Sequence, residues 1–275
     1  MGTQQTLDFQ LDKGLFRFFA GDFQHQPGAR GDLWRVFLDT EEIRELSVYS
    51  HAQTPVSVTV QGDTTAVTYD RLVAENGESY DLELTVYIRR MEGALHFSAD
   101  IHNRSTVRLN ELQLPYLCAG RYACEPEEEI LYSPEVLGRR DYNPRKVIGN
   151  MHTEYMSADY KSITWARTYP NLLSMPWIGL QTGDYYLYLG EQDPELKLLS
   201  VNAHTSPRNT PSELGMSISH YIAAEPGETL HYGESVLALF RGDWRDGAAY
   251  YKAWADRTWY PDPHVRPAWV REITG

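Results

Sequence analysis

Short runs of alternating hydrophobic and polar residues dominate the first half of the chain. The alternation is clearest at 56–60 and at 80–88. A period of two places one side of a strand in a hydrophobic core, and Gly, Asn and Asp between such runs are typical of turns. Similar runs are found at 15–19, 33–38, 65–69, 94–101 and 107–116. The first half is therefore predicted to be all β, with its many strands divided between two facing antiparallel sheets.

The stretch from 168 to 194 is predicted to form a β-hairpin. Its strand-like runs, 174–180 and 185–190, are joined by a turn that contains Gly183. Alternation places Tyr186 and Tyr188 on one face of the second strand and its leucines on the other. Aromatic rings beside carboxylates suit a sugar, which offers an apolar C–H face and a rim of hydroxyls. The alternative is that the hairpin rings are core residues.

Between 120 and 161 the periodicity is lost. This segment contains an acidic run at 125–129 and a mixed polar run at 138–146. A long aperiodic stretch inside a domain is expected to be a loop, either a functional one or a solvated excursion. Strand-like runs then return at 196–201, 216–222 and 235–240.

An amphipathic helix is predicted at 242–257, and Asp243 is in position to cap it. Its apolar residues, three or four positions apart, are Trp244, Ala248, Tyr251 and Trp254 or Ala255. We interpret this aromatic stripe as packing of the helix against a sheet. Prolines at 261, 263 and 267 end the helix and predict an extended linker over 261–275.

Composition and charge exclude some classes of function. The formal net charge is -13, so the chain lacks the basic surface that binds nucleic-acid phosphates. No stretch approaches the length of a membrane span, and the first residues lack the basic start and apolar run of a signal peptide. A cytoplasmic location is expected, with a previously removed leader as the alternative. The 19 Tyr and 7 Trp against 8 Phe favour β structure and polar ligands.

Cys118 and Cys124 are predicted to be free thiols in a reducing compartment. Within one extended strand they would lie too far apart for a disulfide, although an intervening turn would bring them together. Their spacing does not match a zinc site, so no metal is predicted. No cofactor is predicted either.

Four segments resemble a known family, and they occur in order along nearly the whole chain. These segments are ELQLPY at 111–116, SMPW at 174–177, LYLGEQDP at 187–194 and GDW through YKAW at 242–254. Together they resemble the N-terminal β-supersandwich domain of bacterial glycoside-hydrolase-like proteins with the uncharacterised domain DUF6259. The chain also looks related to the sandwich domains that precede the barrel in α-galactosidase-like clans.

The resemblance implies a galactose-mutarotase-like supersandwich at 1–241, a connector helix at 242–260 and a linker at 261–275. In such proteins a Pro-Xaa-Trp linker leads to a (β/α)8 barrel, and Pro267-Ala268-Trp269 looks like that linker. The barrel would carry the catalytic carboxylates, so the resemblance implies an excised N-terminal domain without hydrolase activity of its own. The implied partners are a carbohydrate, bound weakly by this domain alone, and the barrel.

Two other functions are compatible with a sandwich of this kind. A mutarotase needs a His acid and a Glu base, but the His-Pro-Tyr signature of that family is absent. Five histidines in strands or loops stand outside any such signature: His96, His102, His152, His204 and His220. A free-standing lectin-like module is the second alternative, and it should bind an oligosaccharide by itself.

The candidate site residues surround the predicted hairpin. Because strand ends and loops can reach a neighbouring barrel, we expect sugar-facing or interface-facing roles for Trp165, Tyr169, Ser174, Met175, Trp177, Glu191 and Asp193. Glycoside cleavage needs two carboxyl groups at a defined separation. Carboxylates near the hairpin include Glu154, Asp159, Glu191 and Asp193. Ordinary solvation explains most of the acidic residues, so no catalytic residue is assigned.

Overall fold

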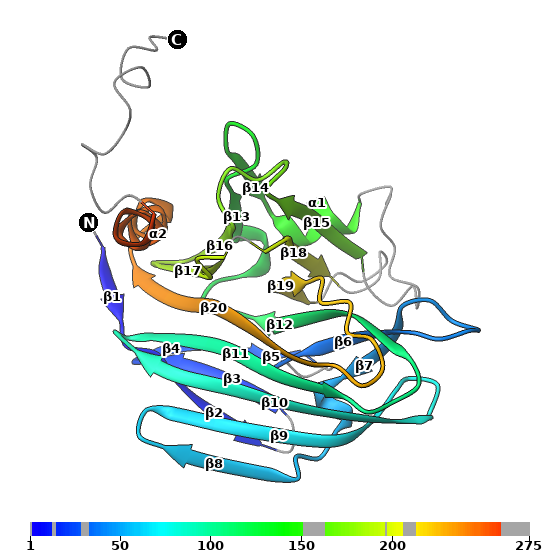
Figure 1. Cartoon of the computed structure of the whole chain (residues 1–275). Helices are drawn as coiled ribbons and strands as arrows, with labels where there is room; N and C mark the ends of the chain where they lie inside the picture. Colours follow the sequence, from blue (N-terminus) through cyan, green and yellow to red (C-terminus); the bar gives the residue numbers. More distant parts are fainter. Residues whose placement is uncertain are drawn as a thin grey trace, which may run out of the picture.

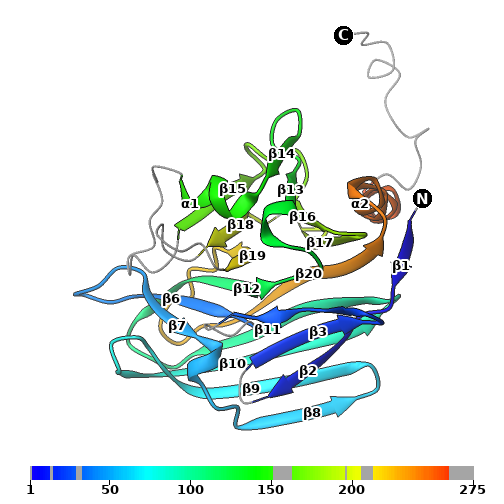
Figure 2. The ribbon, with the colours of Figure 1, turned by 180° about the vertical axis from the view of Figure 1, so that it is seen from behind.

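The computed structural model describes residues 2–12, 15–28, 33–150, 163–195, 197–205 and 213–259. The described chain forms two large antiparallel sheets that face one another, with one long helix against the larger sheet (Figures 1 and 2). The all-β prediction with two facing sheets and one C-terminal helix is confirmed. The predicted linker at 261–275, including Pro267-Ala268-Trp269, lies outside the described residues.

The larger sheet has ten strands in the order β14-β13-β16-β17-β20-β11-β10-β9-β8, and β1 also pairs with β20. Its strands are β1 (Thr3–Gln5), β8 (Ser57–Gln61), β9 (Thr64–Val73), β10 (Ser79–Met91), β11 (Ala94–Asn103), β13 (Ile130–Ser133), β14 (Arg139–Tyr142), β16 (Trp177–Thr182), β17 (Tyr185–Glu191) and β20 (Thr229–Arg241). The predicted hairpin is β16–β17, which starts three residues later than expected and turns at Gly183.

The second sheet has seven strands in the order β15-β18-β19-β12-β6-β7, with β5 paired to β12. Its strands are β5 (Gln26–Pro27), β6 (Arg35–Asp39), β7 (Leu46–Tyr49), β12 (Arg108–Arg121), β15 (Ile163–Tyr169), β18 (Leu199–Thr205) and β19 (Leu214–His220). A third, three-stranded sheet, which the sequence analysis did not separate, contains β2 (Asp8–Asp12), β3 (Leu15–Ala20) and β4 (Phe23–Gln24). The helices are η1 (Ser50–Ala52), η2 (Pro126–Glu128), α1 (Pro144–Gly149) and α2 (Trp244–Thr258).

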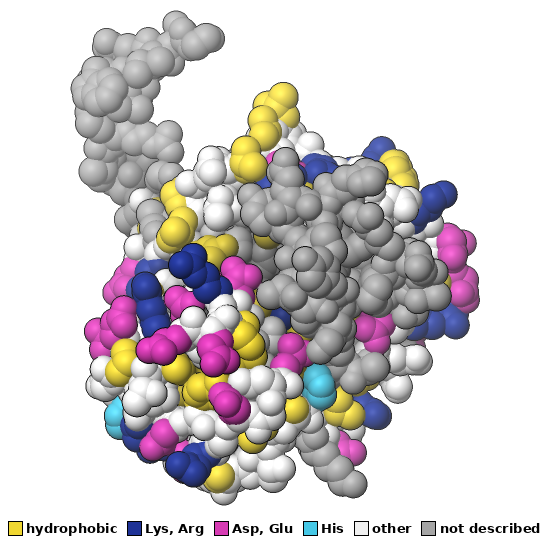
Figure 3. All heavy atoms as spheres, turned by 90° about the vertical axis from the view of Figure 1, so that its right-hand side faces the viewer, with side chains coloured by type: hydrophobic (Ala, Val, Ile, Leu, Met, Phe, Trp, Pro, Cys, Tyr) yellow, Lys and Arg dark blue, Asp and Glu magenta, His cyan; other side chains and the backbone are white. Residues whose placement is uncertain are grey.

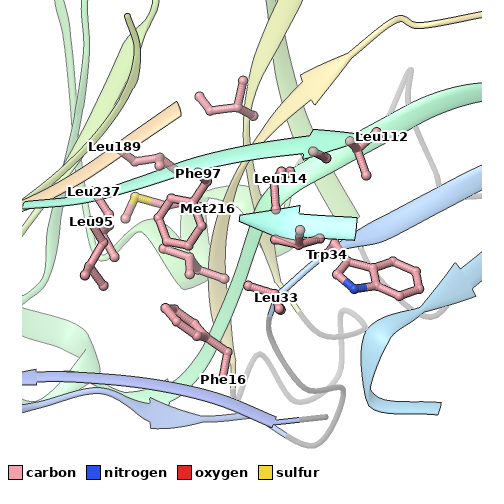
Figure 4. Close-up of a cluster of buried hydrophobic side chains, with 14 of the residues drawn as sticks. Phe16, Leu33, Trp34, Leu95, Phe97, Leu112, Leu114, Leu189, Met216 and Leu237 are labelled. Atoms are coloured by element: carbon pink, nitrogen blue, oxygen red, sulfur yellow. The ribbon is translucent and has the colours of Figure 1, made fainter. Parts of the chain in front are cut away.

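The main hydrophobic core lies between the two large sheets. Leu189, Leu237 and Phe97 from the larger sheet meet Met216 and Leu114 from the smaller one, and all five side chains are at most 1% exposed (Figure 4). Strand alternation explains this arrangement, because every second residue of β17, β20 and β11 points to the same side. The opposite side of these strands is therefore available for another contact.

Helix α2 covers that opposite side over β16, β17 and β20. Asp243 caps the helix as predicted, since its Oδ1 accepts a hydrogen bond from the backbone N–H of Arg245 at 2.9 Å. Tyr251 and Ala255 are buried against the sheet. The interpretation of Trp244 as a core residue is wrong, because its side chain is 41% exposed at the first turn of α2, beyond the buried face.

Two glycines allow the close fit between α2 and the sheet. A Cβ on Gly247 of the helix would lie 2.5 Å from Cε1 of Tyr186. The same tyrosine ring extends over Gly179 of β16, where a Cβ would lie only 1.9 Å from its hydroxyl oxygen. Tyr186 therefore fills the space that both glycines leave, and it is completely buried.

The expectation of a loop from 120 to 161 is wrong for its described part. That part contains η2, β13, β14 and α1, and β13 joins the larger sheet beside β16. A buried ion pair orders the segment, because Arg145 Nε and Nη2 donate to the two carboxylate oxygens of Glu129 at 2.9 and 3.0 Å. Contacts between distant residues, rather than local periodicity, produce this structure.

The clean alternation at 56–60 does not give β8 a buried face. Val58 and Val60 are 53% and 66% exposed, and every residue of the strand is exposed. Because β8 is the outermost strand of the ten-stranded sheet, it pairs with β9 alone within the described chain.

The Glu129–Arg145 ion pair gives a prediction about stability. Arg145→Met should lower the free energy of unfolding by about 3–5 kcal/mol, because it leaves the buried Glu129 carboxylate without its partner. Adding Glu129→Gln should recover much of this loss, since the second change removes the uncompensated charge. Urea denaturation followed by circular dichroism measures both effects.

Arg121→Met is the matched control, because Arg121 pairs with Glu125 on the exposed surface. That change should cost at most about 1 kcal/mol. An equally small effect for Arg145→Met would show that the buried pair does not stabilise this segment.

Candidate functional site

The hairpin β16–β17 buries most of its aromatic residues. Tyr186 and Tyr188 point toward α2, while Leu187 and Leu189 point into the main core, as the alternation predicts. Burial raises the pKa of both tyrosine hydroxyls well above the ordinary value. These two rings therefore hold the helix on the sheet and are not available to a sugar.

The seven predicted site residues lie in three different places. Tyr169, Glu191 and Asp193 line one narrow pocket. Ser174, Met175 and Trp177 line a larger, more apolar hollow. Trp165 is only 3% exposed and belongs to the main core, where the guanidinium carbon of Arg167 lies 4.9 Å from its ring centre. The structure thus separates a set that is close together in sequence.

The narrow pocket contains a buried polar network that joins the two large sheets. Glu191 at the end of β17 places Oε2 2.7 Å from the hydroxyl of Ser235 on β20 and 3.9 Å from Nε2 of His220 on β19. Ser235 Oγ also lies 2.9 Å from the backbone carbonyl of Leu114. The pocket above this network has a volume of about 10 Å³, room for roughly one water molecule.

Burial determines the charges in this network. Loss of solvation raises the pKa of Glu191 to about 8 and lowers the pKa of His220 to about 4. Both groups are therefore mostly neutral at pH 7. A serine hydroxyl has one proton, so Ser235 can donate to only one of its two acceptors. A protonated Glu191 that donates to Ser235, which in turn donates to Leu114, satisfies the geometry.

The larger hollow has a volume of about 490 Å³ and lies between α2 and the β13–β14 hairpin. Tyr132, Met175, Trp177 and Trp244 provide much of its apolar lining. The hairpin tip beside it carries Val136 and Leu137, which are 67% and 98% exposed. In Figure 3 a hydrophobic knob projects at the top of the molecule, where Figure 1 places the tip of this hairpin.

The hairpin tip is held in a fixed shape despite its exposure. Glu135 Oε1 accepts a hydrogen bond from Arg167 at 2.6 Å, and Glu135 also pairs with Arg139. The backbone N–H of Val136 donates to Leu172 O at 2.9 Å. Val136 has a φ of 52°, a left-handed conformation that is strained for a β-branched residue. We call Val136, Leu137, Met175 and Trp244 the apolar tip surface.

A second buried polar network was missed in the sequence analysis. It lies on the face of the seven-stranded sheet that points away from the main core. Asn202 Nδ2 donates to Ser219 Oγ at 2.6 Å, and Gln113 Nε2 donates to Ser219 Oγ at 3.2 Å and to Glu111 Oε1 at 2.9 Å. Burial raises the pKa of Glu111. The available signal was the polar residue at every second position of 200–204 and 217–219.

The described ranges contain no cluster of three or more His, Cys, Asp or Glu side chains arranged to hold a metal ion. None of the helices in these ranges is both long and apolar enough to cross a membrane.

Cys118 and Cys124 are free thiols, as predicted. The candidate carboxylates Glu154 and Asp159, and His152, lie outside the described residues.

Three of the solved structures with a similar fold are named after sugars or after enzymes that act on them. The α-N-acetylgalactosaminidase NagBb from Bifidobacterium bifidum matches with a TM-score of 0.57 and 12% identity, over 94% of this chain and 39% of that chain. A galactose mutarotase-like protein from Lactobacillus casei matches with a TM-score of 0.45 and 9% identity, over 85% and 99%. The GH36 α-galactosidase AgaB from Geobacillus stearothermophilus matches with a TM-score of 0.39 and 11% identity, over 85% and 29%.

The chain matches no protein-family model and no curated protein. The resemblance to DUF6259 proteins therefore stays a prediction. At 12% identity the match to NagBb concerns the fold alone, and this chain spans only 39% of the length of that enzyme. The predicted fold class, an antiparallel supersandwich of two facing sheets, is confirmed by the sheet topology, and the match to NagBb agrees with it.

The raised pKa of Glu191 gives a prediction about pH. Its folded-state pKa of about 8 exceeds the ordinary value of 4.5, so wild-type stability falls as pH rises between these values. Glu191→Gln removes this loss while keeping the size of the side chain. The variant should therefore gain stability relative to wild type by up to about 1.4 kcal/mol per pH unit over this range. Thermal or urea unfolding between pH 5 and pH 8 measures the difference.

Glu195→Gln is the control, because the Glu195 side chain is 67% exposed. That variant should follow the wild-type pH dependence. A constant difference between Glu191→Gln and wild type across the range would mean that Glu191 is already ionised at pH 5.

Proposed function

We propose that this chain is an accessory, carbohydrate-associated domain of a glycoside hydrolase and packs against a catalytic (β/α)8 barrel of the same protein. The observation that carries the proposal is the apolar tip surface. An exposed apolar group of this kind is typical of a surface that contacts a partner. The coverage of NagBb gives further support, because there the fold forms 39% of a longer sugar-cleaving enzyme.

The geometry of the hairpin tip favours docking of a rigid partner. Leu137 is 98% exposed, and burying a leucine side chain stabilises a complex by about 1.5–3 kcal/mol. The ion pairs of Glu135 fix the tip before binding, so little conformational entropy is lost on association. Met175 and Trp244 beside it would extend the buried area.

The burial of the predicted site residues favours a supporting role in sugar binding. Trp165, Trp177 and Glu191 are at most 4% exposed, so a bound sugar would not reach their side chains. Sugar contacts at the rim are left to Tyr169, Ser174, Met175 and Asp193. Small-ligand sites usually enclose most of their ligand. We therefore propose that sugar affinity is weak until a barrel completes the pocket.

The mutarotase alternative requires a His acid and a Glu base with a sugar between them. His220 and Glu191 are 3.9 Å apart beneath a pocket of about 10 Å³. His96 and Glu234 are in direct contact at 2.5 Å. Neither pair leaves room for a pyranose between the two groups, so the accessory domain is the better-supported function. The lectin alternative offers no reason for the apolar tip surface.

Leu137→Glu should disrupt docking. The test measures binding, by surface plasmon resonance, between this chain and a separately expressed polypeptide from the coding sequence downstream of Gly275. We expect the variant to weaken binding at least about tenfold, because it moves a charge into an apolar contact.

Val60→Glu is the control, because Val60 is also an exposed aliphatic residue and lies on β8, far from the apolar tip surface in the sheet order. It should leave binding unchanged. Equal affinities for Leu137→Glu and wild type would rule out docking through this surface, and absence of such a downstream domain would refute the proposal as a whole.

The isolated chain should show no sugar chemistry of its own. We expect it neither to accelerate the mutarotation of fresh α-D-galactose in polarimetry nor to hydrolyse a nitrophenyl α-N-acetylgalactosaminide. In calorimetry it should bind simple sugars weakly or not measurably. Acceleration that His220→Gln abolishes would establish the mutarotase instead, and tight binding of an oligosaccharide would establish the lectin.

A further inference from the structure

A polar hollow of about 390 Å³ lies on the outer face of the ten-stranded sheet, over β10, β11 and β20. Its volume falls within the range of about 300–1,000 Å³ that is usual for small-ligand pockets. None of the predicted site residues contributes to it. The lining side chains and backbone belong to Thr64, Tyr87, Arg89, His96, Phe97, Ser98, Asp100, His231, Gly233 and Glu234.

A β-bulge in β20 shapes this hollow. The pairing register between β11 and β20 shifts after Phe97, so that Gly233 and Glu234 together lie opposite Ser98. Gly233 has a φ of 127°, and a Cβ at this position would lie 2.7 Å from the backbone of Phe97 and Ser98. Bulges turn side chains out of the regular pattern and are frequent beside binding sites. Here the bulge places Glu234 where its carboxylate contacts His96 of β11.

Each side of the hollow carries a carboxylate bound to a histidine. On one side, Glu234 Oε1 accepts hydrogen bonds from His96 Nδ1 and Arg89 Nη2, both at 2.5 Å. On the other side, Asp100 bonds to His231 Nδ1 at 2.6 Å and accepts a hydrogen bond from the Tyr87 hydroxyl at 2.7 Å. These contacts hold both carboxylates in place before any ligand arrives.

Several polar atoms in the hollow remain free to bind a ligand. Within the described chain, Glu234 Oε2 and the Ser98 hydroxyl make no hydrogen bond. A carboxylate has about four acceptor positions, so Asp100 also retains acceptor capacity. The hollow therefore offers fixed acceptors beside a hydroxyl and the Arg89 guanidinium.

We infer that this hollow is a binding site for one neutral monosaccharide unit. Sugar hydroxyls both donate and accept hydrogen bonds, so they match carboxylates placed beside a guanidinium and a hydroxyl. The two carboxylates disfavour an anionic ligand. The choice of a sugar over other neutral polyols rests on the proposed function, whereas the site itself rests on the geometry of the bulge.

The test is an NMR titration of the intact chain with galactose and, separately, with N-acetylgalactosamine. We expect at least one of these sugars to shift the backbone amide signals of Ser98 and Gly233. Asp100→Asn and Glu234→Gln should each weaken that binding by about tenfold or more, because each replaces a charged acceptor by a neutral amide. Thermal unfolding of both variants checks that the fold is kept.

Glu83→Gln is the matched control. Glu83 is on β10, and its carboxylate pairs with Arg104, which is not among the residues of the hollow. It should leave sugar binding unchanged. Leu137 does not line the hollow, so the docking test and the sugar titration are independent. Docking can fail while sugar binding is found, and sugar binding can fail while docking is found.

Three results would overturn the inference. The first is that the amides of Ser98 and Gly233 respond to neither sugar; a response to calcium chloride alone would then identify a cation site. The second is that sorbitol, an open-chain polyol, binds as well as the sugars, which would remove the selectivity for a sugar ring. Binding that neither carboxylate variant weakens would place the sugar elsewhere.

Discussion

Burial of both faces of β17 is the constraint on which the described structure depends. Its leucines complete the core between the sheets, and its tyrosines need a second cover on the opposite side, which α2 provides. A charged residue on either face would lose its solvation without a partner. The position of α2 in turn brings Trp244 beside Met175, and the end of the strand brings Glu191 to the junction of the two sheets.

The larger sheet presents two different surfaces on the two sides of α2. Toward β13 and β14 lies the apolar tip surface, and toward β11 and β10 lies the polar hollow. The two surfaces suit different partners, because desolvation favours contact with apolar groups and penalises unpaired polar ones. A domain with this division can contact a protein on one side of the helix while a small polar molecule occupies the other.

Local periodicity predicted the strands of the first half, the hairpin and the helix, because one buried face produces a regular pattern. It did not predict which residues far apart in the sequence would contact one another. Glu191 acquires its neutral state through burial beside Ser235 and His220, which follow it by 44 and 29 positions. Arg145 orders its segment through Glu129, and neither residue stands out in a polar run. The predicted site residues were separated because they belong to different elements: Trp165 and Tyr169 lie on β15 of the smaller sheet, whereas Glu191 lies on β17 of the larger one.

The outermost strand β8 has a consequence for how copies of the chain behave together. Its row of backbone groups beyond β9 is unpaired within the described chain, and it displays Val58 and Val60 to solvent. An open edge with β-branched side chains is a template onto which a strand of another molecule can add. Crowded solutions of this protein therefore favour lateral growth of the sheet from one molecule to the next.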